Sequence, residues 1–312
     1  MVSLEKNIKR IAAVDLGTNT FRYLIVDYDT VSQSKTVIAE KEVFVKVFEK
    51  NSQIITDEKL KLAEETLKNF SNDFKKYKVD FIKAIATEAW RSAENGMHFI
   101  NEIKKSLSLE IEIIDGQKES DYAFQAVCSL LDDNHQPFLL MDIGGGSTEF
   151  VFFENKKILY SVSFPIGSSK VKNKFPFSDP PKSSEIAYLK GFYQDSITDL
   201  KSISIPENAS IIGLSGAFET LGSIMSKDKC PLLLEVKKED FTAVTEDVLA
   251  KNPEEIKLIP GMHPLRADLM PYALLLIEVV MRQFSIKSVF CTTVSLRNAL
   301  ADEMASEKVN RL

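Results

Sequence analysis

Cysteine is scarce in this sequence. The 312 residues include three cysteines, Cys128, Cys230 and Cys291, and none of them form a C-x-x-C pair. An odd number of cysteines without that spacing fits neither a disulfide framework nor a zinc site. We therefore expect small buried thiols in a reducing compartment.

Long apolar runs and a surplus of positive charge are also missing. No segment approaches the ~20 apolar residues needed to cross a bilayer, and the start, MVSLEKNIKR, lacks the apolar core of a signal peptide. The net charge of −6 argues against a broad basic surface for nucleic acid. We expect a cytoplasmic protein that binds neither membranes nor nucleic acids. A polyanionic ligand would then need a local basic strip and a metal ion.

The composition is that of a folded protein with more than one core. Hydrophobic residues make up 44% and charged residues 27% of the chain, which is ordinary for globular proteins. A length of 312 residues exceeds what one core usually organises, so two domains are expected.

An internal repeat supports this division. Residues 11–27 (IAAVDLGTNTFRYLIVD) align with residues 138–154 (FLLMDIGGGSTEFVFFE) at a constant offset of 127, which places Asp15 on Asp142 and Gly17 on Gly144. Each copy reads as an apolar strand ending in Asp, a loop of glycine and small hydroxyl residues, and a second strand. This pattern predicts a β-hairpin with a phosphate-type loop in each half.

The order of the predicted elements indicates the fold class. A third strand follows each hairpin (36–47 and 157–164), and the segments 81–96, 111–127, 209–224 and 286–304 each read as a strand followed by a helix. Residues 57–77 carry apolar side chains at helical spacing. The order β-β-β-α-β-α-β-α thus occurs twice. It resembles the duplicated ribonuclease-H-like α/β fold of the actin-like ATPase and sugar-kinase superfamily, with two domains and an interdomain cleft.

Domain bounds follow from the repeat. We expect one domain over residues 1–125 and another over residues 126–312, with the last helix, about 297–312, able to pack back on the first domain.

The DIGGGSTE segment suits anion binding. Consecutive glycines allow close backbone approach to a phosphate, and Ser147 and Thr148 add hydroxyl donors. The spacing matches neither the dinucleotide fingerprint nor the P-loop. A tight hairpin turn is the structural alternative, but three successive glycines exceed what a two-residue turn needs.

Carboxylates lie beside both predicted loops. Asp15 and Asp142 end matching strands, and Glu149 follows the second loop, where carboxylates can hold Mg²⁺. Surface turn or cap residues are the alternative for each. Glu119 opens a predicted helix, and by position alone it would simply favour the helix dipole.

Basic residues near these loops are the candidates for neutralising phosphate. They are Arg22, Arg91, Lys118, Arg266 and Arg297. Lys170, Lys172 and Lys174 alternate in SSKVKNK, and on an extended segment they would share one side and could follow a chain of phosphates. A solvated surface is the alternative for each of them.

Taken together, the motifs resemble the exopolyphosphatase and guanosine pentaphosphate phosphohydrolase family. The matching blocks include AVDLGTNTFRYLIVD, ATEAWRSAENG, IIDGQKESDYAFQAV, MDIGGGSTEF, IIGLSGAFETL and IPGMHPLRAD, in family order from about residue 11 to 300. The resemblance implies hydrolysis of terminal phosphoanhydride bonds of inorganic polyphosphate by metal-assisted attack of water. Release of orthophosphate would depend on Mg²⁺ or Mn²⁺.

The resemblance also implies roles for individual residues. Glu119 would be the general base, Asp142 and Glu149 would act with it, and Asp15, Asp142 and Glu149 would hold the metal. The implied phosphate-binding residues are Gly17, Thr18, Asn19, Arg22, Arg91, Gly144, Gly145, Gly146, Ser147, Ser215, Gly216 and Arg266. A homodimer is also common among similar proteins.

The chain departs from the family pattern in places. IGLSGAFETL replaces a more usual Gly-Gly-Thr turn, and SLRNAL occupies the place where the family often has an Arg-Glu-Gly sequence. We also expect a short form without the C-terminal helical extension of longer relatives. Hydrolysis of guanosine pentaphosphate to the tetraphosphate, which would link the protein to the stringent response, remains an alternative. A non-catalytic alarmone or polyphosphate sensor and a sugar kinase or chaperone-type ATPase are further alternatives.

Overall fold

The computed structural model describes residues 7–47, 53–131 and 136–309, with side chains given up to Ser306. The chain divides into two compact units, Met1–Asp115 with Leu296–Leu312, and Gly116–Ser295. The expected boundary after residue 125 falls inside a helix, α4 (Gly116–Cys128), and the chain changes unit at the start of that helix. Residues 310–312 of the predicted last helix lie outside the described residues.

The first unit is built on a mixed sheet of five strands. Its order is β3-β2-β1-β4-β5, with β1 (Ile8–Leu16), β2 (Thr20–Asp29), β3 (Lys35–Phe44), β4 (Phe81–Ala86) and β5 (Ile111–Ile113). Strands β1, β2 and β3 pair antiparallel, whereas β4 runs parallel to both β1 and β5. This is the arrangement predicted for a ribonuclease-H-like unit.

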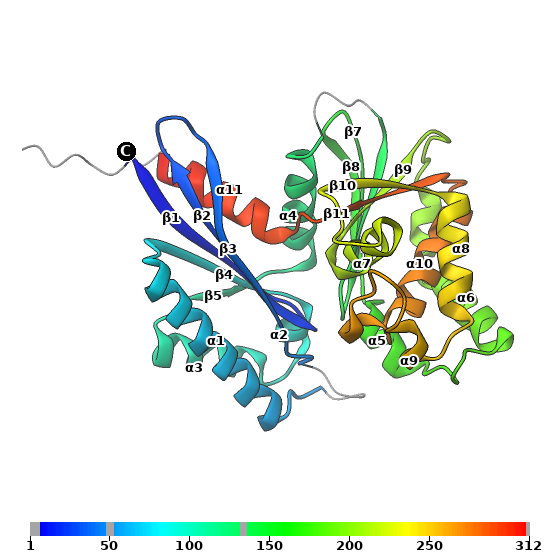
Figure 1. Ribbon diagram of the computed structural model, residues 1–312, viewed down its shortest axis with the longest axis horizontal. Helices are drawn as coiled ribbons and strands as arrows, with labels where there is room; N and C mark the ends of the chain where they lie inside the picture. Colours follow the sequence, from blue (N-terminus) through cyan, green and yellow to red (C-terminus); the bar gives the residue numbers. More distant parts are fainter. Residues whose placement is uncertain (1–6, 48–52, 132–135, 310–312) are drawn as a thin grey trace, which may run out of the picture. The chain divides into compact units, whose positions relative to one another are not determined.

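Helices cover both faces of the first sheet (Figure 1). Helix α1 (Asp57–Tyr77) has the bounds that its periodicity predicts, and it buries Leu67, Phe70 and Phe74 against the sheet. Helices α2 (Glu88–Ser92) and α3 (Gly96–Leu107) share this face, where Trp90 packs as a core residue. Helix α11 (Leu296–Val309) packs against β1 and β2 from the other face.

The second unit repeats this plan and adds one strand. The order of its sheet is β10-β11-β9-β6-β7-β8, with β6 (Phe138–Ile143), β7 (Thr148–Glu154), β8 (Lys157–Phe164), β9 (Ser210–Leu214), β10 (Leu233–Lys237) and β11 (Ser288–Thr292). Without the edge strand β10, the order matches that of the first sheet strand for strand. The duplication predicted from the aligned hairpins is therefore present in the sheet topology.

Two groups of helices flank the second sheet (Figure 1). Helix α4 packs on one face against β6, β7 and β8. The other face carries the larger core, whose helices are α6 (Ser183–Ser196), α7 (Ser215–Ser226), α8 (Lys238–Leu249) and α10 (Met270–Gln283). Shorter helices complete the unit: α5 (Ser168–Lys174), η1 (Thr198–Ser202), α9 (Pro253–Ile256) and η2 (Pro264–Arg266).

The two units exchange their last helices along the chain. Helix α4 follows β5 of the first sheet but belongs to the second unit, and α11 follows β11 of the second sheet but belongs to the first unit. Asp15 and Asp142 alternate along their strands with residues that line the main core, so they lie on the opposite face of each sheet. Helix α11 covers that face in the first unit, and α4 covers it in the second.

Two details differ from expectation. The third strand of the first unit, expected to reach Val47, ends at Phe44 because the N–H groups of Val45, Lys46 and Val47 bond to the hairpin loop instead of to β2. The segment with alternating lysines is helix α5, so Lys170, Lys172 and Lys174 do not form the extended track that alternation predicted. Among the described residues, none of the helices is long and apolar enough to span a membrane.

Candidate active site

The glycine loop of the second unit is a closed hairpin turn. The Gly144 N–H donates to the carbonyl of Ser147 at 3.0 Å, and the strands pair up to Ile143 and Thr148. Gly145, Gly146 and Ser147 are buried. The first unit repeats the turn, since the Gly17 N–H donates to the carbonyl of Thr20 at 3.0 Å.

Two predicted carboxylates share one face of the second sheet, and a third lies in the helix that covers this face. Asp142 on β6 lies directly opposite Glu149 on β7, so both side chains emerge on the same side. That side is covered by α4, whose Phe124 contacts Phe153. Glu119 lies in the first turn of this helix. Glu119, Asp142 and Glu149 are 7%, 3% and 1% exposed, so all three acidic groups are buried.

A serine that sequence reasoning missed holds one of these carboxylates. Ser163 on β8 lies opposite Glu149, and its hydroxyl donates to Glu149 Oε1 at 2.8 Å. Helix α4 comes close at this point, because a Cβ atom on Gly116 would lie 2.7 Å from the Cβ atom of Ser163. The contact places the start of α4, and with it the first turn that carries Glu119, beside the strand next to Glu149.

The start of α7, directly after β9, contacts Asp142 through Ser215. The Ser215 hydroxyl donates a hydrogen bond to Asp142 Oδ1, although Ser215 has a left-handed backbone with φ of 70°. The hydroxyl predicted to bind phosphate is thus directed at a carboxylate. This arrangement joins the end of β6 to the end of β9 and the first turn of α7.

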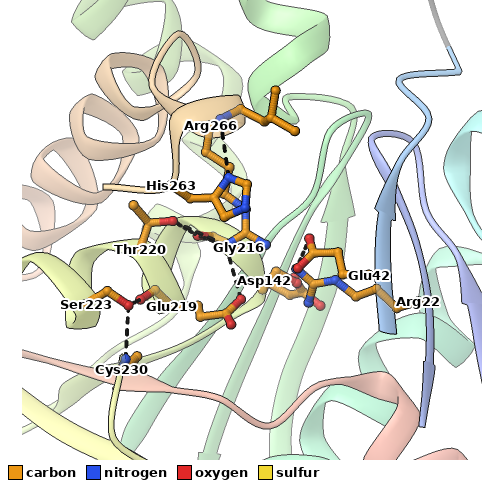
Figure 2. Close-up of polar contacts among 12 residues, drawn as sticks. Arg22, Glu42, Asp142, Gly216, Glu219, Thr220, Ser223, Cys230, His263 and Arg266 are labelled. Atoms are coloured by element: carbon orange, nitrogen blue, oxygen red, sulfur yellow. Dashed lines mark hydrogen bonds and ion pairs between the residues drawn. The ribbon is translucent and has the colours of Figure 1, made fainter. Parts of the chain in front are cut away.

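Arg266 lies over the same turn of α7 (Figure 2). Its Nη1 atom donates to the Gly216 carbonyl at 3.3 Å, to Glu219 Oε2 at 3.2 Å and to Thr220 Oγ1 at 3.3 Å. The approach is close, since a Cβ atom at position 216 would lie 2.5 Å from the Arg266 Nε atom and would push the guanidinium group aside. The sequence predicted Arg266 and Gly216 as site residues, and the structure brings them together.

The first unit carries opposite charges at the equivalent places. Asp15 pairs across the hairpin with Arg22, and Arg22 donates to Glu42 Oε1 at 2.8 Å (Figure 2). Arg297, in the first turn of α11, donates to the Tyr23 carbonyl at 3.0 Å from a buried position. Burial and the nearby charge of Arg22 together lower the pKa of Arg297 to about 10, against the opposing effect of Asp15. The first hairpin therefore combines cations and anions, whereas the second is acidic.

Arg91, another predicted phosphate ligand, belongs to the first unit. Its side chain donates to Glu88 Oε2 at 2.7 Å and to the Ile114 carbonyl, which links α2 to the end of β5. Lys172 makes an ion pair with Asp268, and Lys174 lies 4.9 Å from the ring centre of Phe192. These lysines hold α5 to its neighbours, so their side chains do not form one row.

The side chains of the second unit offer only some of the ligands that a divalent cation needs. In the described part of the chain, no three His, Cys, Asp or Glu side chains are grouped so that they could hold a metal ion. Asp142 and Glu149 offer two neighbouring carboxylates in one unit, and Asp15 lies in the other unit. Mg²⁺ commonly uses one or two carboxylates and completes its shell with water and substrate phosphates, so the pair fits this ion.

Comparison with known proteins identifies the family. The model of the Ppx/GppA phosphatase family matches residues 25–308. The chain belongs to the Ppx/GppA phosphatase family. Among solved structures, this family member resembles an exopolyphosphatase from Cytophaga hutchinsonii, with a TM-score of 0.90 and 29% identity over 96% of this chain and 98% of that chain. The family member from Aquifex aeolicus shares the fold, with a TM-score of 0.80 and 23% identity over 97% of this chain and 99% of that chain. The predicted family and two-unit α/β fold are confirmed.

Curated relatives of this family member carry related names. Exopolyphosphatase 2 of Mycobacterium tuberculosis is 23% identical over 88% of this chain and 91% of that protein. A bifunctional 3-dehydroquinate synthase/phosphatase of Fusobacterium nucleatum is 27% identical over 88% of this chain, which spans only 43% of that relative's length.

Proposed function

We propose that this phosphatase removes terminal orthophosphate from inorganic polyphosphate. The observation that carries the proposal is the buried pair of Asp142 and Glu149 on one sheet face beside a closed glycine loop, with buried Glu119 in the first turn of the helix that covers this face. The names of the relatives from Cytophaga hutchinsonii and Mycobacterium tuberculosis support the same substrate.

The residues of the second unit divide the work of phosphoryl transfer. Glu119 takes a proton from the attacking water, and the N–H groups of Gly145, Gly146 and Ser147 bond to oxygens of the terminal phosphate. Such a reaction depends mainly on positioning and on stabilising charge at the phosphoryl oxygens. No covalent enzyme intermediate is required, because orthophosphate leaves when water attacks in line.

A divalent cation, Mg²⁺ or Mn²⁺, would be held by Asp142 and Glu149 in the second unit. Asp15, in the first unit, stays a predicted metal ligand that the family resemblance implies. When bound, the cation would neutralise charge on phosphate oxygens. Ser215 and Ser163 would hold the two carboxylates of the second unit in place, since Ser215 donates a hydrogen bond to Asp142 and Ser163 donates one to Glu149. Such supporting hydrogen bonds fix the orientation of metal ligands.

The remaining predicted residues would bind the rest of the substrate. We propose that Gly17, Thr18 and Asn19 offer a second phosphate-binding turn, and that Arg22 and Arg91 supply positive charge. Arg22 and Arg91 each hold a carboxylate of their own unit, Glu42 and Glu88. Binding of a polyanion would therefore compete with existing ion pairs. This competition favours a substrate with several charges over a single phosphate.

Guanosine pentaphosphate is the second candidate substrate, since the matched family includes GppA phosphatases. It would use the same carboxylates and loop for its terminal phosphate. A sensor without turnover is less compatible with three buried carboxylates. The homodimer expected from the resemblance and the cytoplasmic location expected from the sequence composition stay predictions.

The test is orthophosphate release by the purified protein with Mg²⁺. Short-chain polyphosphate, long-chain polyphosphate and guanosine pentaphosphate are offered in parallel, with Glu119→Gln as the control. We expect release from polyphosphate that vanishes in the variant while substrate binding persists. Binding without release by the wild-type protein would instead identify a sensor, and unchanged turnover in the variant would remove Glu119 from its role.

A further inference from the structure

The segment that follows β8 lies along the glycine loop of the second unit. The Gly167 N–H donates to the Gly146 carbonyl at 3.1 Å, the Ser168 N–H to the Gly144 carbonyl at 2.9 Å, and the Lys170 N–H to the Gly145 carbonyl at 3.0 Å. Three successive carbonyls of the loop are thus bonded to one short segment, Gly167–Lys170, which we name the brace.

These bonds determine where the N–H groups of the loop point. A trans peptide group is planar, and its N–H and C=O bonds point in opposite directions. The carbonyls of Gly144, Gly145 and Gly146 point toward the brace. The N–H groups in the same three peptide units, those of Gly145, Gly146 and Ser147, must therefore point away from it. The brace turns the loop into a row of donors on its opposite side.

The close approach of the brace depends on small residues. A Cβ atom on Gly167 would lie 2.5 Å from the carbonyl carbons of Gly145 and Gly146, which are backbone atoms that cannot move without moving the loop. Ser168 adds a second bond, since its hydroxyl donates to the Gly144 carbonyl at 3.2 Å. Gly167 caps α5 and Ser168 is the first residue of that helix, so the brace is anchored at a helix end.

The first unit has a brace at the equivalent loop. The N–H groups of Val45 and Lys46 donate to the Asn19 carbonyl at 2.9 and 3.0 Å, and the Val47 N–H donates to the Thr18 carbonyl at 2.9 Å. In the repeat, Thr18 and Asn19 align with Gly145 and Gly146. Both units therefore hold the same two loop carbonyls with the segment that follows their third strand, although the sequences of the two segments are unlike.

We propose that the brace Gly167–Lys170 is a positioning element for catalysis, which fixes the loop donors that bind the terminal phosphate. This inference rests on the proposed function, because it gives those donors a phosphate to bind. Neither Gly167 nor Ser168 touches the substrate in this scheme. Their effect passes through the peptide groups of the loop.

A matched pair of variants at position 168 isolates the backbone bond. Ser168→Ala removes only the hydroxyl, whereas Ser168→Pro also removes the N–H and sets a ring carbon against the Gly144 carbonyl. Proline is well tolerated at the first position of a helix, and Gly167, with ψ of 153°, has the backbone that a following proline requires. We expect Ser168→Pro to lower kcat/KM for polyphosphate about 100-fold, as for loss of one preorganised donor, and Ser168→Ala to lower it only a few-fold.

A glycine pair provides a second comparison. Gly167→Ala forces the brace away from the loop, and Gly191→Ala on α6 adds a Cβ atom with nothing within 4 Å. We expect the first variant to lose activity like Ser168→Pro and the second to match the wild type. Thermal unfolding of each variant separates a displaced loop from an unfolded protein.

Amide NMR of the wild-type protein tests the geometry without any variant. Orthophosphate should shift the resonances of Gly145, Gly146 and Ser147, whereas those of Ser168 and Lys170, which face the loop carbonyls, should stay nearly constant. Equal shifts in both groups, or full activity in folded Ser168→Pro, would overturn the brace. A wild-type protein without polyphosphatase activity would overturn the proposed function, while this titration would still decide about the brace.

Discussion

Ser215 donates its hydroxyl hydrogen bond to Asp142 from a left-handed backbone, with φ of 70°. For a residue other than glycine this conformation costs roughly 1–2 kcal/mol. Strain of this kind persists where the surrounding structure requires it, often at functional sites. The hydroxyl contact to Asp142 is the feature that glycine, the residue best suited to this backbone, could not supply.

Replacing Ser215 by glycine should therefore separate stability from activity. We expect Ser215→Gly to keep or raise the midpoint of thermal unfolding, because the strain is relieved, and to lower kcat about tenfold, because a hydrogen bond to a charged group is lost. Lys227→Gly is the matched control, since Lys227 ends the same helix with φ of 56°. It should raise stability without changing kcat. Wild-type activity in Ser215→Gly would show that Asp142 is oriented by other contacts.

Ser163→Ala tests the support of the other carboxylate. The substitution removes the donor that lies 2.8 Å from Glu149 Oε1 and leaves Glu149 itself in place. We expect kcat to fall about tenfold and the Mg²⁺ concentration for half-maximal activity to rise, because supporting hydrogen bonds typically contribute 10–100-fold to metal affinity or activity. Ser161→Ala, two residues away on the same strand, should leave both quantities near their wild-type values. Equal effects of the two substitutions would contradict a specific role for Ser163.

Elements with strong periodicity could be predicted from the sequence. The bounds of α1 follow from its apolar spacing, and the two hairpins follow from the aligned Asp and Gly residues. The alignment even places Arg22 on Glu149. The consequence of having arginine in one copy and glutamate in the other depends on the cross-strand register. That register places Arg22 opposite Asp15 and Glu149 opposite Asp142.

Contacts between elements could not be predicted in this way. Ser163 and Gly116 are far apart in the sequence, and they meet because α4 docks on β8. The brace contacts the loop mainly through backbone groups, so no pattern of residue types predicts it. The lysine pattern was misleading because lysine occupies every second position in SSKVKNK, which is a strand-like spacing. The segment is a helix, with Gly167 at its start and backbone hydrogen bonds to the glycine loop.

Alkaline pH should destabilise the second unit. Burial raises the pKa of the Tyr272 hydroxyl to about 12, above the ordinary value of 10. Below pH 10 both folded and unfolded states keep this proton; between pH 10 and 12 the unfolded state loses it first, so stability falls by about 1.4 kcal/mol per pH unit. Urea unfolding from pH 8 to 11 measures this slope. Tyr272→Phe should reduce this slope without abolishing it, because burial also raises the pKa of Tyr193, Cys230 and Cys291 in the same unit. An unchanged slope would assign the effect to those groups.

The three cysteines should be inert in the native protein. Burial raises the pKa of Cys128 and of Cys230 to about 11, and it raises that of Cys291 as well. At pH 7.5 a thiol with pKa near 11 has about 100-fold less thiolate than one with the ordinary value of 9, and thiolate is the reactive form. Iodoacetamide should therefore label native protein slowly and leave phosphate release intact, whereas urea-unfolded protein should be labelled at all three thiols. Rapid loss of activity would point to an accessible cysteine at the site.

Gly116→Ala tests whether the docking of α4 positions Glu119. The new Cβ atom would lie 2.7 Å from Ser163 Cβ and 2.9 Å from Ser163 Oγ, so the first turn of α4 must move outward. Because Glu119 lies in that turn, we expect kcat to fall at least tenfold while the protein stays folded. Ser163→Gly removes both atoms that clash, but it also removes the donor to Glu149.

The double variant therefore separates the two effects. If the clash alone causes the loss, Gly116→Ala with Ser163→Gly should have the kcat of Ser163→Gly, since the added Cβ atom then has space. Additive losses would mean that glycine at position 116 is needed for its backbone conformation and not for the approach to β8. In that case the position of Glu119 would depend on the helix itself and not on its contact with the strand beside Glu149.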